Sequence, residues 1–243
     1  MRSVHRYPMV TGGMSIKSIA LAPLYVPQAL WVAARASRLP EAPGARQGRC
    51  GQGDPRRLMV LGDSSAAGVG ASDQRLALGG QLSAVLAQHF SVDWQVVARS
   101  GGTTASTLRL LDGLAPRGLD FVTIALGVND VKNGVRPRAW ADRYARLLNL
   151  VDEKFAPERV CVSGVPPIRH FPILPWPLND VLGARAEAFD TQLRALCAER
   201  SNVRHLPLDF MLHAAEMAPD NFHPGPKLYR AWAVEIANVL RAP

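Results

Sequence analysis

Residues suited to acyl-transfer chemistry stand in short polar segments of this 243-residue chain. Ser64 lies in Gly-Asp-Ser-Ser at 62–65, and Asp220 and His223 lie three residues apart in Asp-Asn-Phe-His-Pro at 220–224. A serine hydroxyl becomes an effective nucleophile when an adjacent base takes its proton, and a histidine base needs a carboxylate to fix its tautomer. Because an aspartate and a histidine at this spacing can meet across one turn of backbone, a single loop can supply both. These residues predict a Ser-His-Asp triad.

Two further segments carry groups that could stabilise an oxyanion. Asn129, in a Gly-Val-Asn-Asp segment, has side-chain N–H donors, and the glycines of an Arg-Ser-Gly-Gly-Thr-Thr segment let the backbone approach a substrate closely. Purely structural interpretations exist for the same residues: Ser64 as a helix cap, and Asn129 or Gly101 as turn residues. We expect the neighbouring Asp63 and Asp130 to hold loops by hydrogen bonds.

The elements that must position these segments alternate between strand and helix patterns. The predicted strands, which are short continuous apolar runs, are 57–61, 92–98, 121–126, 159–163 and 203–208. The predicted helices are 78–90, 104–114, 137–155, 178–200 and 227–240. Buried strands separated by helices predict an α/β fold: a three-layer, doubly wound, flavodoxin-like parallel sheet of about five strands with helices on both faces. Ligands bind beyond the carboxyl ends of the strands in such a sheet, and polar segments follow the first three strands.

In their order and spacing, the four segments resemble the sequence blocks of the SGNH, or GDSL-like, hydrolases. The resemblance covers about residues 57–241 and implies a serine esterase that uses neither a cofactor nor a metal. It implies that Ser64 is the nucleophile and His223 the base, with Asp220 as the partner of the base. It also implies an oxyanion hole formed by the backbone N–H of Ser64, a glycine N–H and the Asn129 amide.

Two positions differ from the family pattern or leave it open. Both Gly101 and Gly102 stand two residues before a threonine, as the pattern requires, and we prefer Gly101 as the oxyanion donor. Asn221 stands where the family commonly has a glycine. Because asparagine tolerates turn conformations, this departure affects the geometry of the loop and leaves the triad in place.

Other classes of protein are disfavoured by their missing motifs. The chain has no G-x-x-x-x-G-K-[ST] motif and no H-E-x-x-H motif, no G-x-G-x-x-G follows the first predicted strand, and Ala66 replaces the last glycine of a G-x-S-x-G elbow. Three widely spaced cysteines predict neither a disulfide framework nor a zinc site. Residues 1–57 carry +7 of the net charge of +8, so the rest of the chain is nearly neutral, which argues against nucleic-acid binding. A non-catalytic, membrane-tethered binding domain that keeps the fold is the alternative to an enzyme.

The chain divides near residue 57 into a basic N-terminal segment with a linker, residues 1–57, and a hydrolase domain, residues 58–243. Residues 40–56 are rich in proline, glycine and arginine and predict the linker.

Residues 18–34 contain no charged side chain and have about the shortest length that can span a bilayer. Three interpretations remain open. The segment is an anchor at a membrane surface, a signal peptide with a cleavage-like Ala-Arg-Ala at 34–36, or a helix packed on the domain. The first favours a membrane-associated or cell-envelope protein, and a cytoplasmic location is the alternative.

The segment Val165–Pro177 is rich in proline and apolar residues, which makes it stiff without regular structure. We predict that Phe171, Leu174 and Trp176 line an acyl-chain pocket, and the alternative is a loop packed over the edge of the core. Together with the apolar N-terminal segment, this loop favours acyl-lipid or short acyl esters as small-molecule substrates. Thioesters, acetylated sugars and acyl transfer to an alcohol stay open.

Overall fold

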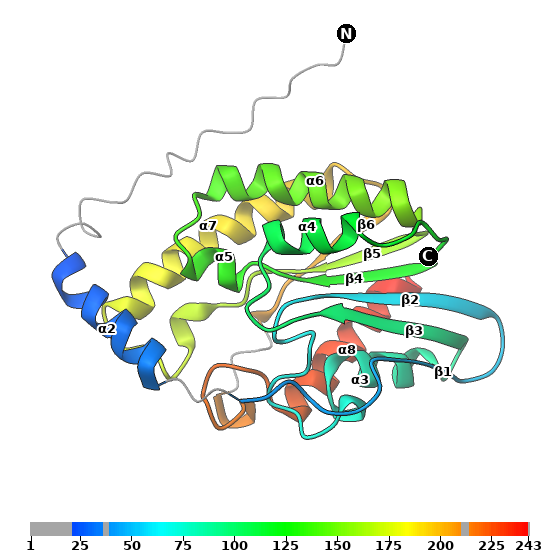
Figure 1. The fold of residues 1–243 in the computed structure, drawn as a ribbon, viewed down its shortest axis with the longest axis horizontal. Coiled ribbons are helices and arrows are strands. Elements are labelled where there is room, and N and C mark those ends of the chain that lie inside the picture. Colours follow the sequence, from blue (N-terminus) through cyan, green and yellow to red (C-terminus); the bar gives the residue numbers. More distant parts are fainter. Residues whose placement is uncertain (1–20, 36–38, 210–213, 243) are drawn as a thin grey trace, which may run out of the picture.

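The computed structural model describes residues 21–35, 39–209 and 214–242, and its centre is a single six-stranded sheet (Figure 1). The strands lie in the order β1-β3-β2-β4-β5-β6. Their bounds are β1 Gln47–Cys50, β2 Pro55–Gly62, β3 Ser91–Ala98, β4 Phe121–Ala125, β5 Arg159–Ser163 and β6 Val203–Leu206. Strands β2 to β6 pair in parallel, and β1 pairs antiparallel with β3 at one edge. The predicted α/β fold is confirmed, with one more strand than expected.

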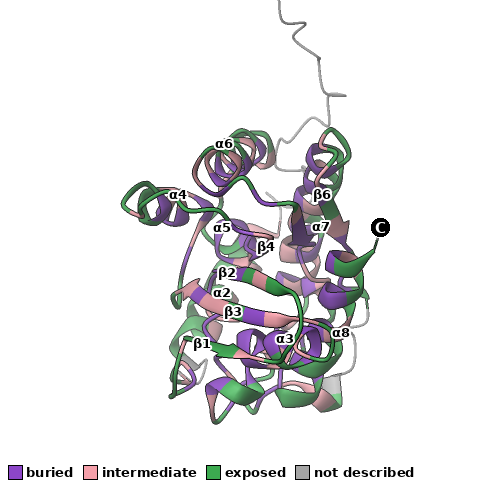
Figure 2. Ribbon diagram, turned by 90° about the vertical axis from the view of Figure 1, so that its right-hand side faces the viewer, coloured by how far each residue is buried: buried purple, intermediate pink, exposed green. Residues whose placement is uncertain are grey.

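Helices cover both faces of the sheet and complete the three layers. Their bounds are α2 Ala22–Arg35, α3 Leu78–Leu86, α4 Thr104–Asp112, α5 Val128–Lys132, α6 Pro137–Phe155, α7 Leu178–Ala198 and α8 Pro226–Arg241. Helices α3 and α8 pack together on one face, and α4, α6 and α7 cover the other (Figure 1). Buried residues concentrate between these layers (Figure 2). The five predicted helices are confirmed, whereas α5 forms where a loop was expected.

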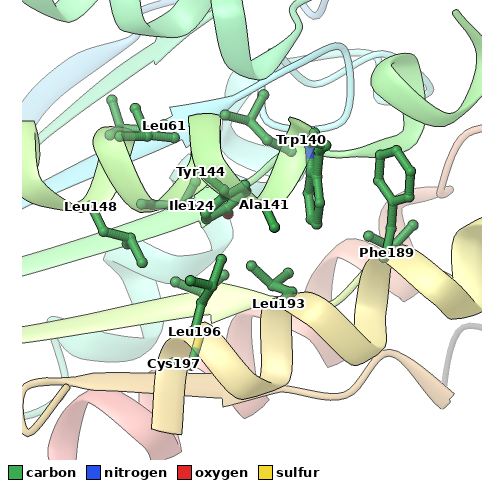
Figure 3. Packing of buried hydrophobic residues seen from close by; sticks show 14 of the residues in the cluster. Leu61, Ile124, Trp140, Ala141, Tyr144, Leu148, Phe189, Leu193, Leu196 and Cys197 are labelled. Atoms are coloured by element: carbon green, nitrogen blue, oxygen red, sulfur yellow. The ribbon is translucent and has the colours of Figure 1, made fainter. Parts of the chain in front are cut away.

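The larger hydrophobic core lies between the sheet and helices α6 and α7. Helix α6 begins with Pro137, which needs no hydrogen-bonded N–H in the first turn. Its buried Trp140 and Tyr144 recur at helical spacing and point toward α7, where the Phe189 ring stacks on Trp140 with centroids 4.4 Å apart (Figure 3). This packing fixes the layer that borders the carboxyl ends of β4 and β5.

The segment predicted as a linker, residues 40–56, is integrated into the domain. Residues 47–50 form β1, Ala42 is buried, and the Glu41 carboxylate accepts a hydrogen bond of 2.5 Å from the Ser100 N–H. The linker prediction is therefore wrong for these residues. Pairing with β3, rather than an apolar pattern of its own, stabilises this edge strand, so its composition does not reveal it.

Helix α2, formed by most of the uncharged N-terminal segment, packs on α7. Tyr25 and Val32 contact the larger core, and the Gln28 side chain donates to the Trp176 carbonyl at 2.7 Å and accepts from the Leu178 N–H at 3.3 Å. The packed-helix interpretation is thus confirmed for α2, while the start of that segment lies outside the described residues. Within the described ranges, no helix combines the length and apolar character needed to cross a membrane. The anchor and signal-peptide interpretations stay predictions.

Candidate active site

The register of the sheet brings three of the four polar segments to one place. Gly62, the last residue of β2, pairs with Ala98 at the end of β3 and with Ala125 at the end of β4. Because these parallel strands end level with one another, the chain segments that follow them leave the sheet at the same edge. That edge is where ligands bind in a doubly wound sheet.

The predicted triad residues form one hydrogen-bonded chain. His223 Nε2 lies 2.9 Å from Ser64 Oγ, and His223 Nδ1 lies 2.6 Å from Asp220 Oδ2. The other carboxylate oxygen of Asp220 accepts the backbone N–H groups of Phe222 and His223 at 3.0 Å each, which closes the loop around it. The geometry is that of a serine activated by a histidine and oriented by an aspartate.

Close contact between two turns brings Ser64 to this loop. The turn after Ser64 passes so near Pro224 that a Cβ on Gly70, where φ is +97°, would lie 2.4 Å from the Pro224 carbonyl oxygen. Only glycine permits this approach. In the loop itself, Asn221 has a φ of +53°, the left-handed conformation that asparagine adopts more readily than most residues. The contacts of His223 with Asp220 and Ser64 are present beside this residue, so the departure at Asn221 leaves the triad in place, as expected.

The electrostatics of the triad favour an ionised Asp220. Burial opposes its ionisation, but hydrogen bonds from His223 and the Phe222 N–H outweigh burial and hold the pKa of Asp220 below its ordinary value. A carboxyl group with a lowered pKa in the folded state adds stability above its ordinary titration range, and that stability is lost only as the pH falls through the lowered pKa. The negative partner of the histidine is therefore retained across the neutral and mildly acidic range.

The backbone distinguishes the two candidate glycines for an oxyanion hole. Gly102 donates its N–H to the Arg99 carbonyl at 3.1 Å. The N–H groups of Ser64 and Gly101 make no hydrogen bond within the part of the chain that the structure describes, and both residues line the same cavity. Gly101 has a φ of +74°, which turns its backbone into a conformation that residues with a side chain rarely adopt. Of the two glycines, Gly101 is the one with a free donor.

Asn129 lies in the first turn of α5, the short helix that follows β4 in the chain. Its Nδ2 donates to the Gly102 carbonyl at 2.9 Å and lies 3.3 Å from Asp63 Oδ2. Asp63 is buried, which raises its pKa, and its other carboxylate oxygen accepts the Ser65 N–H at 3.0 Å. The predicted loop-holding role of Asp63 is confirmed, because it links the serine turn to Asn129.

Asp130 supports the neighbouring loop. Its Oδ2 accepts hydrogen bonds from the Thr104 N–H at 2.9 Å and from the Thr104 hydroxyl at 3.0 Å, at the first turn of α4. The Trp140 indole N–H in turn donates to that hydroxyl oxygen at 2.9 Å. Asp130 therefore holds the loop between β3 and α4, as predicted.

Comparison with protein families assigns the chain to a class of enzyme. The model of the GDSL-like lipase/acylhydrolase family matches residues 60–231. The chain belongs to this family. It is therefore an ester-hydrolysing enzyme.

Solved structures share the fold of this GDSL-like hydrolase. A lipolytic protein of the G-D-S-L family from Veillonella parvula DSM 2008 is 17% identical with a TM-score of 0.60, covering 75% of this chain and 97% of that one. Esterase EstA from Pseudoalteromonas sp. is 19% identical with a TM-score of 0.58, covering 76% and 97%. TesA is 22% identical with a TM-score of 0.59, covering 76% and 98%. A search among curated proteins gave no significant match.

A cavity of about 640 Å³ opens beside Ser64 and His223 of the hydrolase. Its walls are mostly aliphatic and come from the serine turn, the segment after β5, helix α7 and helix α2. Leu174 lines this cavity, as predicted. Phe171 does not line this cavity. It lines a smaller second cavity at Ser64 and packs edge-to-face on Phe222, with ring centroids 5.3 Å apart. The proline-rich loop thus contributes both a wall and a support for the residue that precedes His223.

Trp176 does not take the predicted place in the pocket. Its side chain is 63% exposed, lines neither cavity at Ser64, and donates its indole N–H to Asp180 Oδ2 at 3.2 Å. The prediction for Trp176 is wrong because this hydrogen bond to the first turn of α7 holds the indole at the surface.

The sequence analysis did not identify several residues that lie around the site. Lys132 lines the cavity, with its ammonium 5.0 Å from the Phe222 ring centroid, and its place one turn after Asn129 is evident only once α5 is known. Asp190 of α7 accepts hydrogen bonds from His205 of β6 at 2.8 Å and from the Val165 N–H at 3.0 Å. This pair anchors the start of the pocket loop, and no sequence motif indicates it.

Proposed function

We propose that this GDSL-like hydrolase cleaves carboxylic esters of apolar acyl groups through an acyl-enzyme on Ser64. The observation that carries the proposal is the hydrogen-bonded chain from Ser64 through His223 to Asp220 at the edge of a largely aliphatic cavity of about 640 Å³. Pockets of this size and lining accept small apolar ligands.

In the first step, His223 Nε2 takes the hydroxyl proton as Ser64 Oγ attacks the ester carbonyl carbon. Asp220 keeps the other ring N–H of His223 in place and stabilises the imidazolium that forms. Breakage of the carbon–oxygen bond then leaves the acyl group on Ser64, and the imidazolium returns the proton to the departing alcohol. In the second half of the reaction, His223 deprotonates a water that attacks the acyl carbon, and the imidazolium returns this proton to Ser64 Oγ as the bond to the acyl group breaks and the acid leaves.

Negative charge on the substrate oxygen is stabilised by three N–H donors. The backbone N–H groups of Ser64 and Gly101 are free to point at this oxygen. Asn129 Nδ2 keeps one hydrogen on the Gly102 carbonyl and supplies the other in place of its longer contact with Asp63. Donors fixed by the fold in this way act mainly on the transition state, where the charge develops.

The aliphatic cavity favours an acyl chain as the group next to the scissile bond. Leu174, Leu178 and Leu182 line it on one side and present no hydrogen-bonding side chain there. Sugar hydroxyl groups placed against these leucines would lack hydrogen-bond partners, which is costly, and the polar side chains of the lining come from other segments, among them Lys132 and Asn133. Acyl esters therefore fit this site better than carbohydrate acetates.

The proposal is tested with the Ser64→Ala variant and a p-nitrophenyl ester series from acetate to palmitate. The structure of EstA is described as inhibited by monoethylphosphonate, so a fluorophosphonate is a suitable covalent probe. We expect wild-type protein to hydrolyse the esters and to be labelled. Ser64→Ala should lose both properties and keep the same melting temperature. Equal labelling of wild type and variant would show that another residue is the nucleophile.

A further inference from the structure

Helix α2 lies at the surface of the domain, yet Gln28 is its one polar side chain before Arg35, and Gln28 faces α7 through its hydrogen bonds to Trp176 and Leu178. Between Ala22 and Ala34 it contains no charged residue. A helix of this kind is normally enclosed by protein or lipid on every side. The two faces of α2 have different surroundings, and each points to a function.

The inner face of α2 forms part of the active-site cavity. Ala29, Val32 and Ala33 line the cavity of about 640 Å³ that also contains Ser64 and His223. In Figure 1, α2 lies beside α7 at one end of the molecule. The acyl pocket is therefore completed by a helix that precedes the sheet in the chain.

The outer face of α2 is exposed and apolar. Of the seven exposed large hydrophobic residues in the described parts of the chain, four are on this helix. These are Leu24 at 52%, Val26 at 48%, Leu30 at 69% and Trp31 at 49% exposure. Such a concentration of apolar side chains on one short element marks an interaction surface.

Charge in the surrounding sequence indicates which partner this surface contacts. Residues 1–40 contain five arginine or lysine residues and no aspartate or glutamate. A basic segment of this kind is attracted to an anionic lipid surface, and a 14-residue helix is too short to cross the bilayer. It suits a helix that lies in the plane of the interface with its apolar face in the acyl region.

We propose that the outer face of α2 docks this hydrolase on anionic lipid bilayers, and that its inner face admits ester substrates from the lipid layer directly into the cavity at Ser64. The second half of this proposal rests on the proposed esterase function. The substrate class would then be acyl esters dissolved in a membrane, whose chains pass from the bilayer to aliphatic walls without crossing water.

The test uses the full chain, a double variant Leu24→Gln/Leu30→Gln, and vesicles of phosphatidylcholine with or without phosphatidylglycerol. Binding is read by co-sedimentation, which needs no catalysis. Hydrolysis is measured on p-nitrophenyl acetate in solution and on a fluorogenic acyl ester embedded in the vesicles. We expect wild type to bind the anionic vesicles more tightly. The double variant should bind about tenfold more weakly or worse, because two leucines no longer enter the lipid.

Hydrolysis of the embedded ester should fall in parallel with binding, while hydrolysis of the acetate stays the same, since Leu24 and Leu30 do not line the cavity. Leu110→Gln is the matched control, because Leu110 is 39% exposed on α4. It should behave as wild type in every assay.

Three outcomes would overturn the proposal: no binding of wild type to anionic vesicles, unchanged binding of the double variant, or reduced binding with undiminished cleavage of the embedded ester. The first would favour a protein as the partner of α2, and the second would place lipid binding on another part of the chain. Failure of wild type to cleave the soluble acetate and the other p-nitrophenyl esters would instead count against the esterase proposal, and the co-sedimentation result would still stand.

Discussion

Among the individual residues of the site, Asn129 is held through both hydrogens of its side-chain amide. Its amide nitrogen donates to the Gly102 carbonyl at 2.9 Å and lies 3.3 Å from the buried Asp63 carboxylate. The contact with the Gly102 carbonyl orients the amide before any substrate binds, and the longer contact with Asp63 is the one that an oxyanion would replace. In the proposed mechanism, this orientation limits the reorganisation that Asn129 needs as charge develops on the substrate.

Replacing Asn129 with alanine should therefore lower kcat by about 10²–10³, equivalent to about 2.7–4 kcal/mol, with little change in KM. The ground-state carbonyl is a modest acceptor and the tetrahedral oxyanion a strong one, so the loss appears equally in kcat and kcat/KM. Steady-state kinetics with p-nitrophenyl esters will measure both parameters.

Asp130→Asn is the control for this prediction, because Asp130 is adjacent in the chain but accepts hydrogen bonds from the Thr104 N–H and hydroxyl and does not line the cavity at Ser64. We expect this substitution to cost about 1–3 kcal/mol in the free energy of unfolding and to leave most of kcat. If Asp130→Asn lost activity and Asn129→Ala kept it, the oxyanion hole would have to be sought elsewhere.

Among the elements, helix α7 links the domain core to the substrate cavity. Its inner residues Phe189 and Leu193 pack in the larger core (Figure 3), whereas Leu178 and Leu182 of its first turns line the cavity. The Asp190–His205 contact fixes the same helix to β6. The wall of the proposed acyl pocket is therefore attached to the larger hydrophobic core, and its shape should set the accepted chain length.

We predict that Leu182→Trp shortens the cavity and lowers kcat/KM for long acyl esters about tenfold or more relative to acetate, because overpacking an apolar pocket costs about 1–3 kcal/mol. Trp176→Ala is the matched control, since the indole of Trp176 lies outside the cavity. It should leave the chain-length profile unchanged. A profile that shifted with Trp176→Ala alone would place the acyl chain along the outer surface of the loop.

For the whole molecule, the N-terminal part of the chain contains two structural units with different functions. Helix α2 adds a wall to the cavity, whereas the segment from residue 39 to β1 belongs to the sheet domain. Within that segment, Glu41 accepts the Ser100 N–H next to Gly101 and pairs with Arg46, and these hydrogen bonds outweigh burial to lower the pKa of Glu41. The segment before β2 thus supports the loop that contains Gly101, the glycine proposed as an oxyanion donor.

Truncation separates these two units. Deleting residues 1–38 should leave a folded enzyme that cleaves p-nitrophenyl acetate but has lost its preference for long acyl chains. Deleting residues 1–50 also removes β1 and Glu41, and should lower the free energy of unfolding by about 2 kcal/mol or more relative to the shorter truncation. Chemical denaturation and ester hydrolysis check both expectations. Equal stability of the two truncations would show that β1 contributes little to the domain.

The sequence alone determined the alternation of strands and helices, the bounds of α6, and the order of the motifs that contain Ser64, Asn129, Asp220 and His223. These features depend on local physics. Apolar residues at periods set by the backbone form strands and helices, and glycine or asparagine takes the turns, as Asn221 does at a φ of +53°. An aspartate and a histidine three residues apart needed only one loop to meet.

Only the tertiary structure decided the features that depend on a distant partner. Strand β1 forms because its backbone pairs with the edge strand β3. Helix α2 is positioned by the hydrogen bonds of Gln28 with Trp176 and Leu178, at the start of α7. Gly102 donates its N–H to the Arg99 carbonyl, whereas the N–H of Gly101 stays free. The Trp176 indole donates to Asp180, which holds it outside the cavity. Local sequence patterns do not indicate such contacts. The energy of a hydrogen bond or a strand pairing depends on both partners, and the two partners come together in this geometry only in the folded chain.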